Sequence, residues 1–223
     1  TSNAGQSWEE IGPPVPITAE VEDVEFRDPD NGWVLWTTAN SDGSSAFSLA
    51  RTSNQGRDWD VQPLELFASG EAAAYSAEAG MGWFDAQTGW IAVKQATGSN
   101  FSLGTLFTTS DGGVTWTRSV LPVADEVVFS TPQIGWAVGG PTGDQVFQTQ
   151  DGGLTWRDVK PGDSTNSNVT AYKPYFSNGQ GLLVTTSLGV ENSLNIYAYD
   201  SAGNGWSLAN QADLGAETGN IGL

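Results

Sequence analysis

The sequence predicts an all-β fold, a β-propeller made of four-stranded antiparallel blades. Two repeated patterns support this prediction: an eight-residue segment that ends in Trp, and a Gly-Trp pair that follows an aromatic residue at short distance. Both recur at the period of a propeller blade, which holds four strands in about 40–50 residues. A sandwich or a barrel would also explain many short strands, but neither predicts one hairpin repeated with one Trp at a constant position.

The eight-residue segment, called the box below, reads Thr-Ser-Asp-Gly-Gly-Val-Thr-Trp over residues 109–116 and Thr-Gln-Asp-Gly-Gly-Leu-Thr-Trp over residues 149–156. Two looser copies, residues 1–8 and 52–59, carry Asn in place of Asp, and residues 199–206 form a degenerate fifth copy. The Trp residues that end the five copies lie 51, 57, 40 and 50 residues apart. This spacing leaves room for one blade between successive boxes.

The composition of the box is typical of a tight hairpin. An Asp or Asn side chain can accept hydrogen bonds from backbone N–H groups two residues further on, and Gly tolerates a positive φ. The Trp is expected to fold back as an apolar lid whose N–H finds a partner. We therefore assign a structural role to the box residues Asn3, Trp8, Asn54, Trp59, Asp111, Trp116, Asp151, Trp156 and Trp206.

The second pattern is a Phe, four or five intervening residues, and then Gly-Trp with an apolar run. Its copies begin at Phe26, Phe84 and Phe129, and a fourth copy that begins at Phe176 has Leu182 in place of Trp. Each unit then contains a strand ending at the Phe, the Gly-Trp strand, a third strand that runs into the box, and a fourth strand that the box Trp opens. Four complete units result, and Trp36 and Trp83 are the two Trp that lie outside the pattern.

The two ends of the sequence suggest part-blades. The chain starts inside a box, and residues 219–223 would suit the first strand of another blade. We expect one domain over residues 1–223, either a five-bladed ring closed by residues 1–16 with residues 207–223, or a fragment of a parent with more blades. An Ala-rich stretch at residues 72–74 is interpreted as a loop or helical turn in an insertion.

With these boxes the chain resembles the Asp-box (BNR-repeat) propellers. The Gly-Trp strand is most similar to the photosystem II stability/assembly factor-like propellers and their uncharacterised bacterial relatives. The resemblance covers nearly the whole chain and implies that box residues lie at the periphery of each blade. It also implies six or seven blades for the parent protein if the chain is a fragment. It implies a fold rather than an activity, because sialidases, xyloglucanases, sorting receptors and assembly factors all carry the box.

The composition excludes several kinds of chemistry. The chain has no Cys and no His, which rules out disulfides, thiol nucleophiles, Ser-His-Asp catalysis and the usual zinc sites. It has 8 Lys+Arg against 26 Asp+Glu, a net charge of −18, which disfavours nucleic acid and anionic membranes as partners. No apolar run is long enough to span a membrane. We predict no cofactor, no metal, and an extracytoplasmic location, where sequons at Asn100 and Asn168 would accept glycans only in a glycosylating host.

The sialidases among these relatives imply a test for catalysis. They clamp a carboxylate with three arginines and use a Tyr–Glu pair with an Asp. This chain has five Arg, and Arg57, Arg118 and Arg157 lie in a box or just after one. Arg27 and Arg51 remain, one short of the triad, so we assign no catalytic residue.

Acidic residues precede the aromatic residue of several units, where the innermost strand of a blade is expected. They would form an acidic ring for a cation or a basic partner segment, a carboxylate pair about 5–9.5 Å apart for glycoside hydrolysis, or a merely solvated surface. Trp36 and Trp83 would either stack on a sugar or pack inside a blade. The candidate binding residues are therefore Glu22, Glu25, Glu78, Asp125, Glu126, Trp36 and Trp83.

Taken together, the sequence favours a non-catalytic extracytoplasmic scaffold that binds a protein partner or supports an assembly. The resemblance to assembly factors implies a basic Arg patch for such a partner, but the Arg and Lys of this chain are scattered. The alternative is a carbohydrate-active propeller of the glycosidase or sialidase type, or a carbohydrate-binding propeller.

Overall fold

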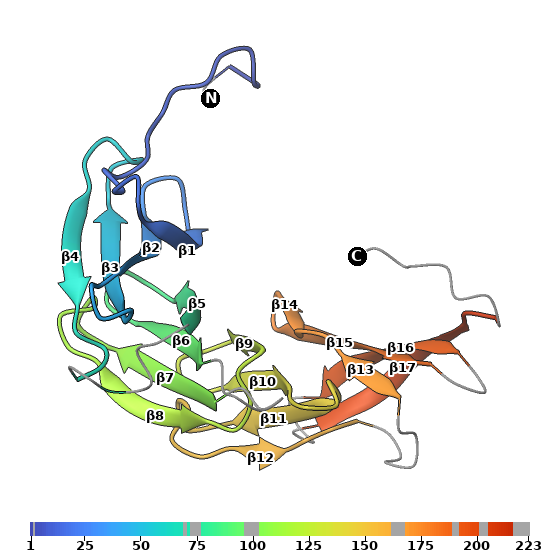
Figure 1. Ribbon diagram of the computed structural model, residues 1–223. Coiled ribbons are helices and arrows are strands. Elements are labelled where there is room, and N and C mark those ends of the chain that lie inside the picture. The colour runs from blue at the N-terminus through green and yellow to red at the C-terminus, as the bar shows by residue number, and fades with distance from the viewer. Residues whose placement is uncertain are drawn as a thin grey trace. The chain divides into compact units, whose positions relative to one another are not determined.

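A computed structural model describes residues 1, 3–68, 71, 77–95, 103–161, 168–188, 192–200 and 205–215. Every regular element among them is a β-strand, and the strands form antiparallel sheets of the meander type (Figure 1). The predicted fold class is confirmed: the chain is a β-propeller with four-stranded blades. Residues 72–74 and 219–223, the sequon at Asn100 and residues 201–204 of the degenerate box lie outside the described residues.

Each blade follows chain order from its first to its fourth strand. The first sheet contains β1 (Glu20–Phe26), β2 (Gly32–Ala39), β3 (Ser45–Thr52) and β4 (Asp60–Leu64). The second contains β5 (Ala77–Trp83), β6 (Gly89–Gln95), β7 (Leu103–Thr109) and β8 (Thr117–Leu121). The third contains β9 (Glu126–Phe129), β10 (Gly135–Gly139), β11 (Gln145–Thr149) and β12 (Arg157–Asp158).

The last sheet has a divided first strand. Its order is β13-β15-β16-β17, and β14 also pairs with β15. The strands are β13 (Val169–Ala171), β14 (Tyr175–Ser177), β15 (Gln180–Ser187), β16 (Ser193–Asp200) and β17 (Gly205–Asp213). Four sheets match the four complete units that the repeats predict, and each third strand runs into a box as expected.

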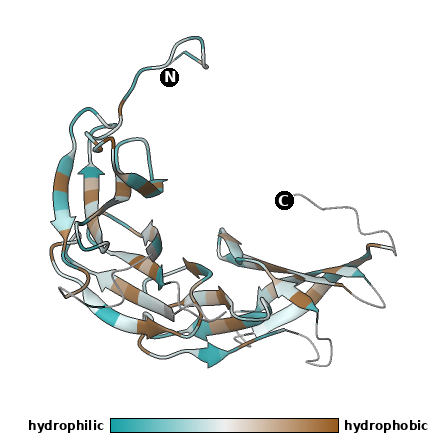
Figure 2. Ribbon diagram, viewed as in Figure 1, coloured by the Kyte–Doolittle hydropathy of each residue, from teal (hydrophilic) through white to brown (hydrophobic). Residues whose placement is uncertain are grey.

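The described chain divides into two compact units. Unit 1 contains residues 1–91 and 109–116, and unit 2 contains residues 92–108 and 117–223. In unit 1 the core is built on β2, whose residues from Gly32 to Thr37 are all buried. In unit 2 a buried cluster lies between the third and the last sheets, around Trp136, Val146 and Leu183. Figure 2 shows apolar and polar bands alternating along many strands, as expected for sheets with unequally buried faces.

The box forms the same hydrogen-bond network in four copies. In the box at residues 109–116, the Thr115 backbone N–H donates to Asp111 Oδ1 at 2.9 Å, and the Thr109 hydroxyl donates to the same oxygen at 2.8 Å. The Gly113 N–H donates in turn to Thr109 Oγ1 at 2.9 Å. Equivalent bonds join the third and seventh residues of the other three boxes, which are Asn3 with Ser7, Asn54 with Asp58, and Asp151 with Thr155.

Two details of the box differ from the sequence prediction. The side chain bonds a backbone N–H four residues further on, not two, because the left-handed residues at positions four and five widen the turn. Position four accepts non-glycine residues as well, since Ala4 and Gln55 have positive φ values of 56° and 67°. The indole N–H of Trp116 donates to the Gly113 carbonyl at 2.9 Å, as expected, but the buried indole N–H of half-buried Trp156 has no such partner among the described residues.

The Gly of the second pattern is required by an aromatic ring that lies on it. A Cβ placed on this Gly would lie 2.3–2.6 Å from an atom of that ring in all four blades. The pairs of ring and glycine are Phe26 with Gly32, Trp83 with Gly89, Phe129 with Gly135, and Phe176 with Gly181. The assignment of Phe84 as the repeat aromatic is therefore wrong. Trp83 occupies that position: β5 ends at Trp83, and five residues separate Trp83 from Gly89, as five separate Phe26 from Gly32.

These rings connect one blade to the next. Trp33 of the first blade stacks on Trp83 with ring centroids 4.8 Å apart and planes at 7°. Trp136 of the third blade stacks on Phe176 of the last at 4.3 Å and 25°. Each repeat aromatic also contacts the box Trp of its own blade at 6.1–6.2 Å, in the pairs Phe26–Trp59, Trp83–Trp116, Phe129–Trp156 and Phe176–Trp206. Many of the Trp residues of the sequence thus pack between blades or within a blade.

The segment before β1 covers one face of the first blade. Val15 and Ala19 pack against a buried cluster of that blade, and the Trp59 indole donates a hydrogen bond to the Ile11 carbonyl at 2.7 Å. No strand is described among residues 1 and 3–19, although the box at residues 1–8 is formed. The closure of a fifth blade by the two ends stays a prediction.

The box carboxylates should make the free energy of unfolding depend on pH in the acidic range. Hydrogen bonds from the Thr155 hydroxyl and backbone N–H lower the pKa of Asp151 to about 2, from an ordinary value of 3.8. Because the folded pKa is the lower one, the stabilisation is complete above about pH 4 and is lost as the pH falls towards 2. We expect Asp151→Asn to remain folded at neutral pH and to show a shallower loss of stability between pH 4 and 2.

The measurement is the free energy of unfolding in urea at a series of acidic pH values. Asn already occupies the equivalent position in two boxes, so the turn should survive the substitution. The control is Glu65→Gln, which removes one exposed charge outside any box. An equally steep acid dependence in Asp151→Asn and in the unsubstituted protein would contradict this expectation.

Candidate functional site

Three carboxylates of β1 hold the edge of β5 within unit 1. Glu22, Asp23 and Glu25 are half-buried, and each accepts a hydrogen bond from a backbone N–H of β5. The donors are alternate residues of β5, namely Ala79, Met81 and Trp83, at 3.1, 2.9 and 2.9 Å respectively. Alternate N–H groups of an edge strand point away from its own sheet, so these carboxylates take the place of a neighbouring strand.

A β-bulge in β1 allows this arrangement. The register of β1 on β2 shifts between Val21 and Asp23, so that Glu22 is the extra residue and both Glu22 and Asp23 can reach β5. Glu22 also accepts a hydrogen bond from the Thr37 hydroxyl at 2.7 Å. Bonds from N–H groups to carboxylates are stronger than neutral ones, and they block the edge of β5 against unintended pairing.

Glu25 has the most unusual environment of the three acids. Burial raises its pKa, the neighbouring Asp23 charge adds to the rise, and the hydrogen bond from the Trp83 N–H opposes it. Arg27, which is also nearby, donates from Nη1 to the Trp83 carbonyl at 2.9 Å. Glu25 and Arg27 therefore bind both backbone groups of Trp83 and position its ring beneath Trp33.

The two acids at the start of the third blade are paired with lysines in unit 2. Asp125 lies 2.9 Å from Lys94 Nζ and accepts a hydrogen bond from the Gly140 N–H at 2.8 Å. Glu126 lies 3.1 Å from Lys173 Nζ, and about half of each of these two side chains is exposed. Exposed pairs of this kind contribute little to stability, so Glu126 is the more available of the two acids.

The other three candidate residues do not form a common site. Glu78 is exposed on β5, next to the residue that binds Glu22. Trp36 and Trp83 are 3% and 2% exposed, and Trp36 belongs to the buried cluster with Val34 and Ala50. Neither ring presents a face to solvent, as stacking on a sugar would require, and blade packing accounts for both.

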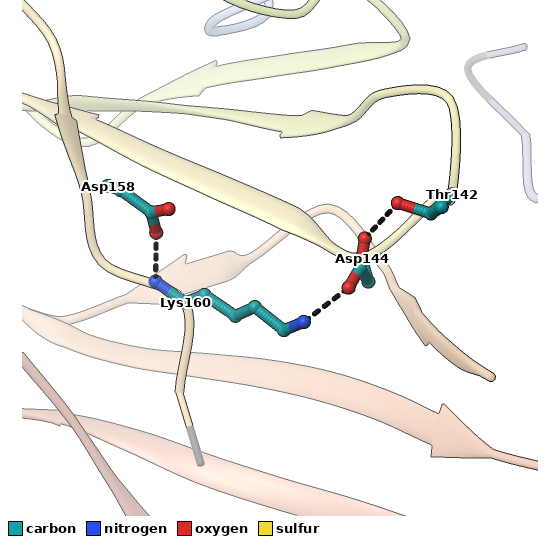
Figure 3. A network of polar contacts seen from close by, with 4 residues as sticks. All are labelled: Thr142, Asp144, Asp158 and Lys160. Carbon is teal, nitrogen blue, oxygen red and sulfur yellow. Dashed lines mark hydrogen bonds and ion pairs between the residues drawn. The ribbon is translucent and has the colours of Figure 1, made fainter. Parts of the chain in front are cut away.

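A further polar network lies beside the third blade in unit 2. Asp144 accepts hydrogen bonds from the Lys160 ammonium and from the Thr142 hydroxyl, and Asp158 accepts one from the Lys160 N–H at 2.9 Å (Figure 3). Burial raises the pKa of Asp144, but the bonds from Lys160 and Thr142 outweigh that effect and lower it overall. The network ties the segment after β12 to the turn before β11 and serves structure.

The described residues offer no further ligand set for catalysis. Among them, no group of three or more Asp or Glu is arranged to hold a metal ion. In the same part of the chain, no helix is long and apolar enough to cross a membrane. Two features were missed by the sequence interpretation, Asp23 and the pairing of Asp144 with Lys160. Asp23 belongs to the run of acids at residues 20, 22, 23 and 25 that precedes Phe26, but it was not among the candidate binding residues. Nothing in the spacing of Asp144 and Lys160 indicates that pair.

Comparison with known proteins identifies no family for this chain. No protein-family model matches the chain, and no curated protein matches it. Among solved structures, the chain is similar to the crystal structure of a thermostable family-43 glycoside hydrolase, at 9% sequence identity and a TM-score of 0.46. That alignment covers 87% of this chain and 73% of the other. The likeness is too distant to support any argument about activity.

Proposed function

We propose that this chain is a non-catalytic, extracytoplasmic propeller that binds a protein partner or scaffolds an assembly. The observation that supports it most directly is the use of the candidate acids in packing. Glu22 and Glu25 accept backbone hydrogen bonds from β5, and Asp125 and Glu126 pair with lysines. A pair of free, facing carboxylates, which glycoside hydrolysis would need, is not formed by these four residues.

The proposal includes membership of the Asp-box propellers, close to the photosystem II stability/assembly factor-like branch. Its support is the box network, which recurs with the same bonds between the third and seventh residues in four copies. A net charge of −18 without Cys or His suits an extracytoplasmic binding protein, and a basic region is the partner surface that this charge favours.

A carbohydrate-active role is the second candidate, and Glu25 is the residue that favours it. A half-buried carboxyl whose pKa is raised by burial beside a second carboxylate, here Asp23, is the arrangement found in glycosidase general acids. Both groups nevertheless accept a hydrogen bond from a β5 N–H group, which is Trp83 for Glu25 and Met81 for Asp23.

Two measurements test the proposed function. The purified chain is assayed against a panel of aryl glycosides and polysaccharides, and we expect no turnover above the buffer rate. The chain is also mixed with the extracytoplasmic proteins of its source, and complexes are isolated by size and weighed by light scattering. We expect a complex of defined stoichiometry. Treating the mixture with glycosidases to remove glycans should not dissociate this complex.

Substitutions separate the two candidates. Turnover that is lost in Glu25→Gln or Glu126→Gln but retained in Glu65→Gln would overturn the scaffold proposal. If a free glycan displaces the partner from the complex, a carbohydrate-binding propeller would be favoured instead. The variants should be compared at equal folded fraction, because Glu25 also supports β5.

A further inference from the structure

β17 differs from the other strands that end a blade. It extends over nine residues, Gly205–Asp213, and every residue from Ser207 to Asp213 is exposed. The fourth strands β4 and β8 have five residues each, and β12 has two. β17 is therefore the longest fourth strand among the described residues, and it lies at the edge of its sheet beyond β16.

The other fourth strands carry features that protect natural sheet edges, and β17 has fewer of them. β4 contains Pro63, β8 contains Arg118, and β12 is too short to template another strand. β17 contains no Pro, Lys or Arg, and Asp213 is its one charged residue. Proline, charge, shortness and β-bulges are the usual means of preventing a further strand from adding. β17 has one such bulge, where Ala209 is left out of the pairing with β16, so the stretch open to pairing is the regular segment after it, residues 210–213.

The hydrogen-bond pattern shows which backbone groups of β17 face outward. The Leu214 N–H donates to the Asn192 carbonyl at 2.9 Å, continuing the ladder in which Ser193 lies opposite Asp213. In an antiparallel pair the bonded positions alternate, so the backbone groups of Gln211 and Asp213 point away from β16. In agreement, the Gln211 N–H donates to the side chain of Asn210 at 2.9 Å rather than to β16.

The side chains and the charge of the protein indicate what kind of strand would add. Leu208 is 55% exposed and shares the strand with Ala209 and Ala212, which gives an incoming chain a mildly apolar surface. Asp213 at one end and the net charge of −18 favour a basic segment over an acidic one. Strand addition takes its affinity from main-chain hydrogen bonds and its selectivity from alternate side chains.

We propose that β17 is a docking edge for an extended, basic peptide segment of a partner protein, which adds to the last blade as an antiparallel strand. The proposal rests on the proposed binding role and specifies where and how the partner binds. It excludes the predicted closure of a ring by residues 1–16 with residues 207–223, because both would use the edge of β17. The outward groups of Gln211 and Asp213 are the anchoring points, and the Asn210 side chain gives up its bond to the Gln211 N–H when the peptide arrives.

The test uses a fluorescein-labelled peptide, Lys-Thr-Val-Thr-Val-Thr-Val-Thr-Lys, as the probe. Binding is followed by fluorescence anisotropy, and hydrogen exchange of backbone amides locates the contact. We expect a Kd below about 1 mM and slower exchange at Gln211 and Asp213. Gln211→Pro removes an outward N–H but no bond to β16, and should weaken binding at least about fivefold.

Gln211→Ala is the matched control, since it removes the same side chain but keeps the N–H, and it should bind within about twofold of the unsubstituted protein. A peptide with Pro at its central position should not bind. Absence of binding, or equal binding by Gln211→Pro, would overturn the proposal. Self-association that Gln211→Pro abolishes would also overturn it, by assigning the edge to a second copy of the chain.

The same variants distinguish this inference from the proposed function. If a partner complex forms equally well with Gln211→Pro, the docking edge is wrong and the binding role stands. If no partner complex forms at all while the peptide binds β17, the proposed binding role is wrong and the inference that β17 is a docking edge stands.

Discussion

Replacing Trp136 by Ala should lower the free energy of unfolding by about 3–5 kcal/mol. Trp136 is 0% exposed and stacks on Phe176 of the next blade at 4.3 Å, with Tyr199 and Trp206 at 5.1 and 5.9 Å. The truncation would open a large cavity between two blades, and the surrounding rigid rings can close it only in part. The measurement is urea unfolding followed by circular dichroism, since the signal then does not depend on the number of Trp.

Leu182→Ala is the matched control for this expectation. Leu182 follows its repeat Gly as Trp136 does, but it is 46% exposed. Losing half-exposed apolar surface should cost about 1 kcal/mol or less. Equal losses in the two variants would show that the Gly-Trp position does not join the blades, contrary to the stacking seen at Trp136.

Gly153→Ala should cost about 2–4 kcal/mol through two separate effects. Gly153 has a φ of +89°, which strains any residue with a Cβ. A Cβ at this position would also lie 2.2 Å from Leu106 Cδ2, and Leu106 is fully buried, so it has no room to retreat. The box would have to separate from the neighbouring strand β7.

Gly179→Ala isolates the backbone effect, because Gly179 has a similar φ of +76° with no atom within 4 Å of the added Cβ. It should cost less than about 1.5 kcal/mol. Thermal and urea unfolding of the two variants, measured side by side, give the difference. A Gly153→Ala protein as stable as Gly179→Ala would mean that the box does not pack tightly on Leu106.

The local features of the fold were predictable because they are short-range. A Thr, an Asp or Asn, and a Gly within eight residues determine the box turn, and its bonds recur wherever those residues recur. The period of the Trp residues then indicates four blades. The repeat aromatic of the second blade was harder to predict, since Trp83 and Phe84 are adjacent and the spacing to Gly89 fits either one. Only the ring lying on Gly89 shows that Trp83 is the repeat aromatic.

The candidate site illustrates the same division. The sequence indicated that acids would gather before the aromatic residue of a blade, and Glu22 and Glu25 do lie on β1 as expected. It could not show that their carboxylates would accept N–H groups of β5, which is more than fifty residues further along the chain. The sequences of an edge strand and of a row of carboxylates do not indicate whether the two will bind each other or will both face water.

The sequence by itself therefore determined the fold class, the box turns and the identity of the blades, because each depends on contacts within a few residues or on a counted repeat. The tertiary structure alone decided the roles of Glu25 and Trp83 and the exposure of β17. Burial and hydrogen-bond partners depend on which segments from different blades come together. That information is distributed over the whole chain and is not contained in any single motif.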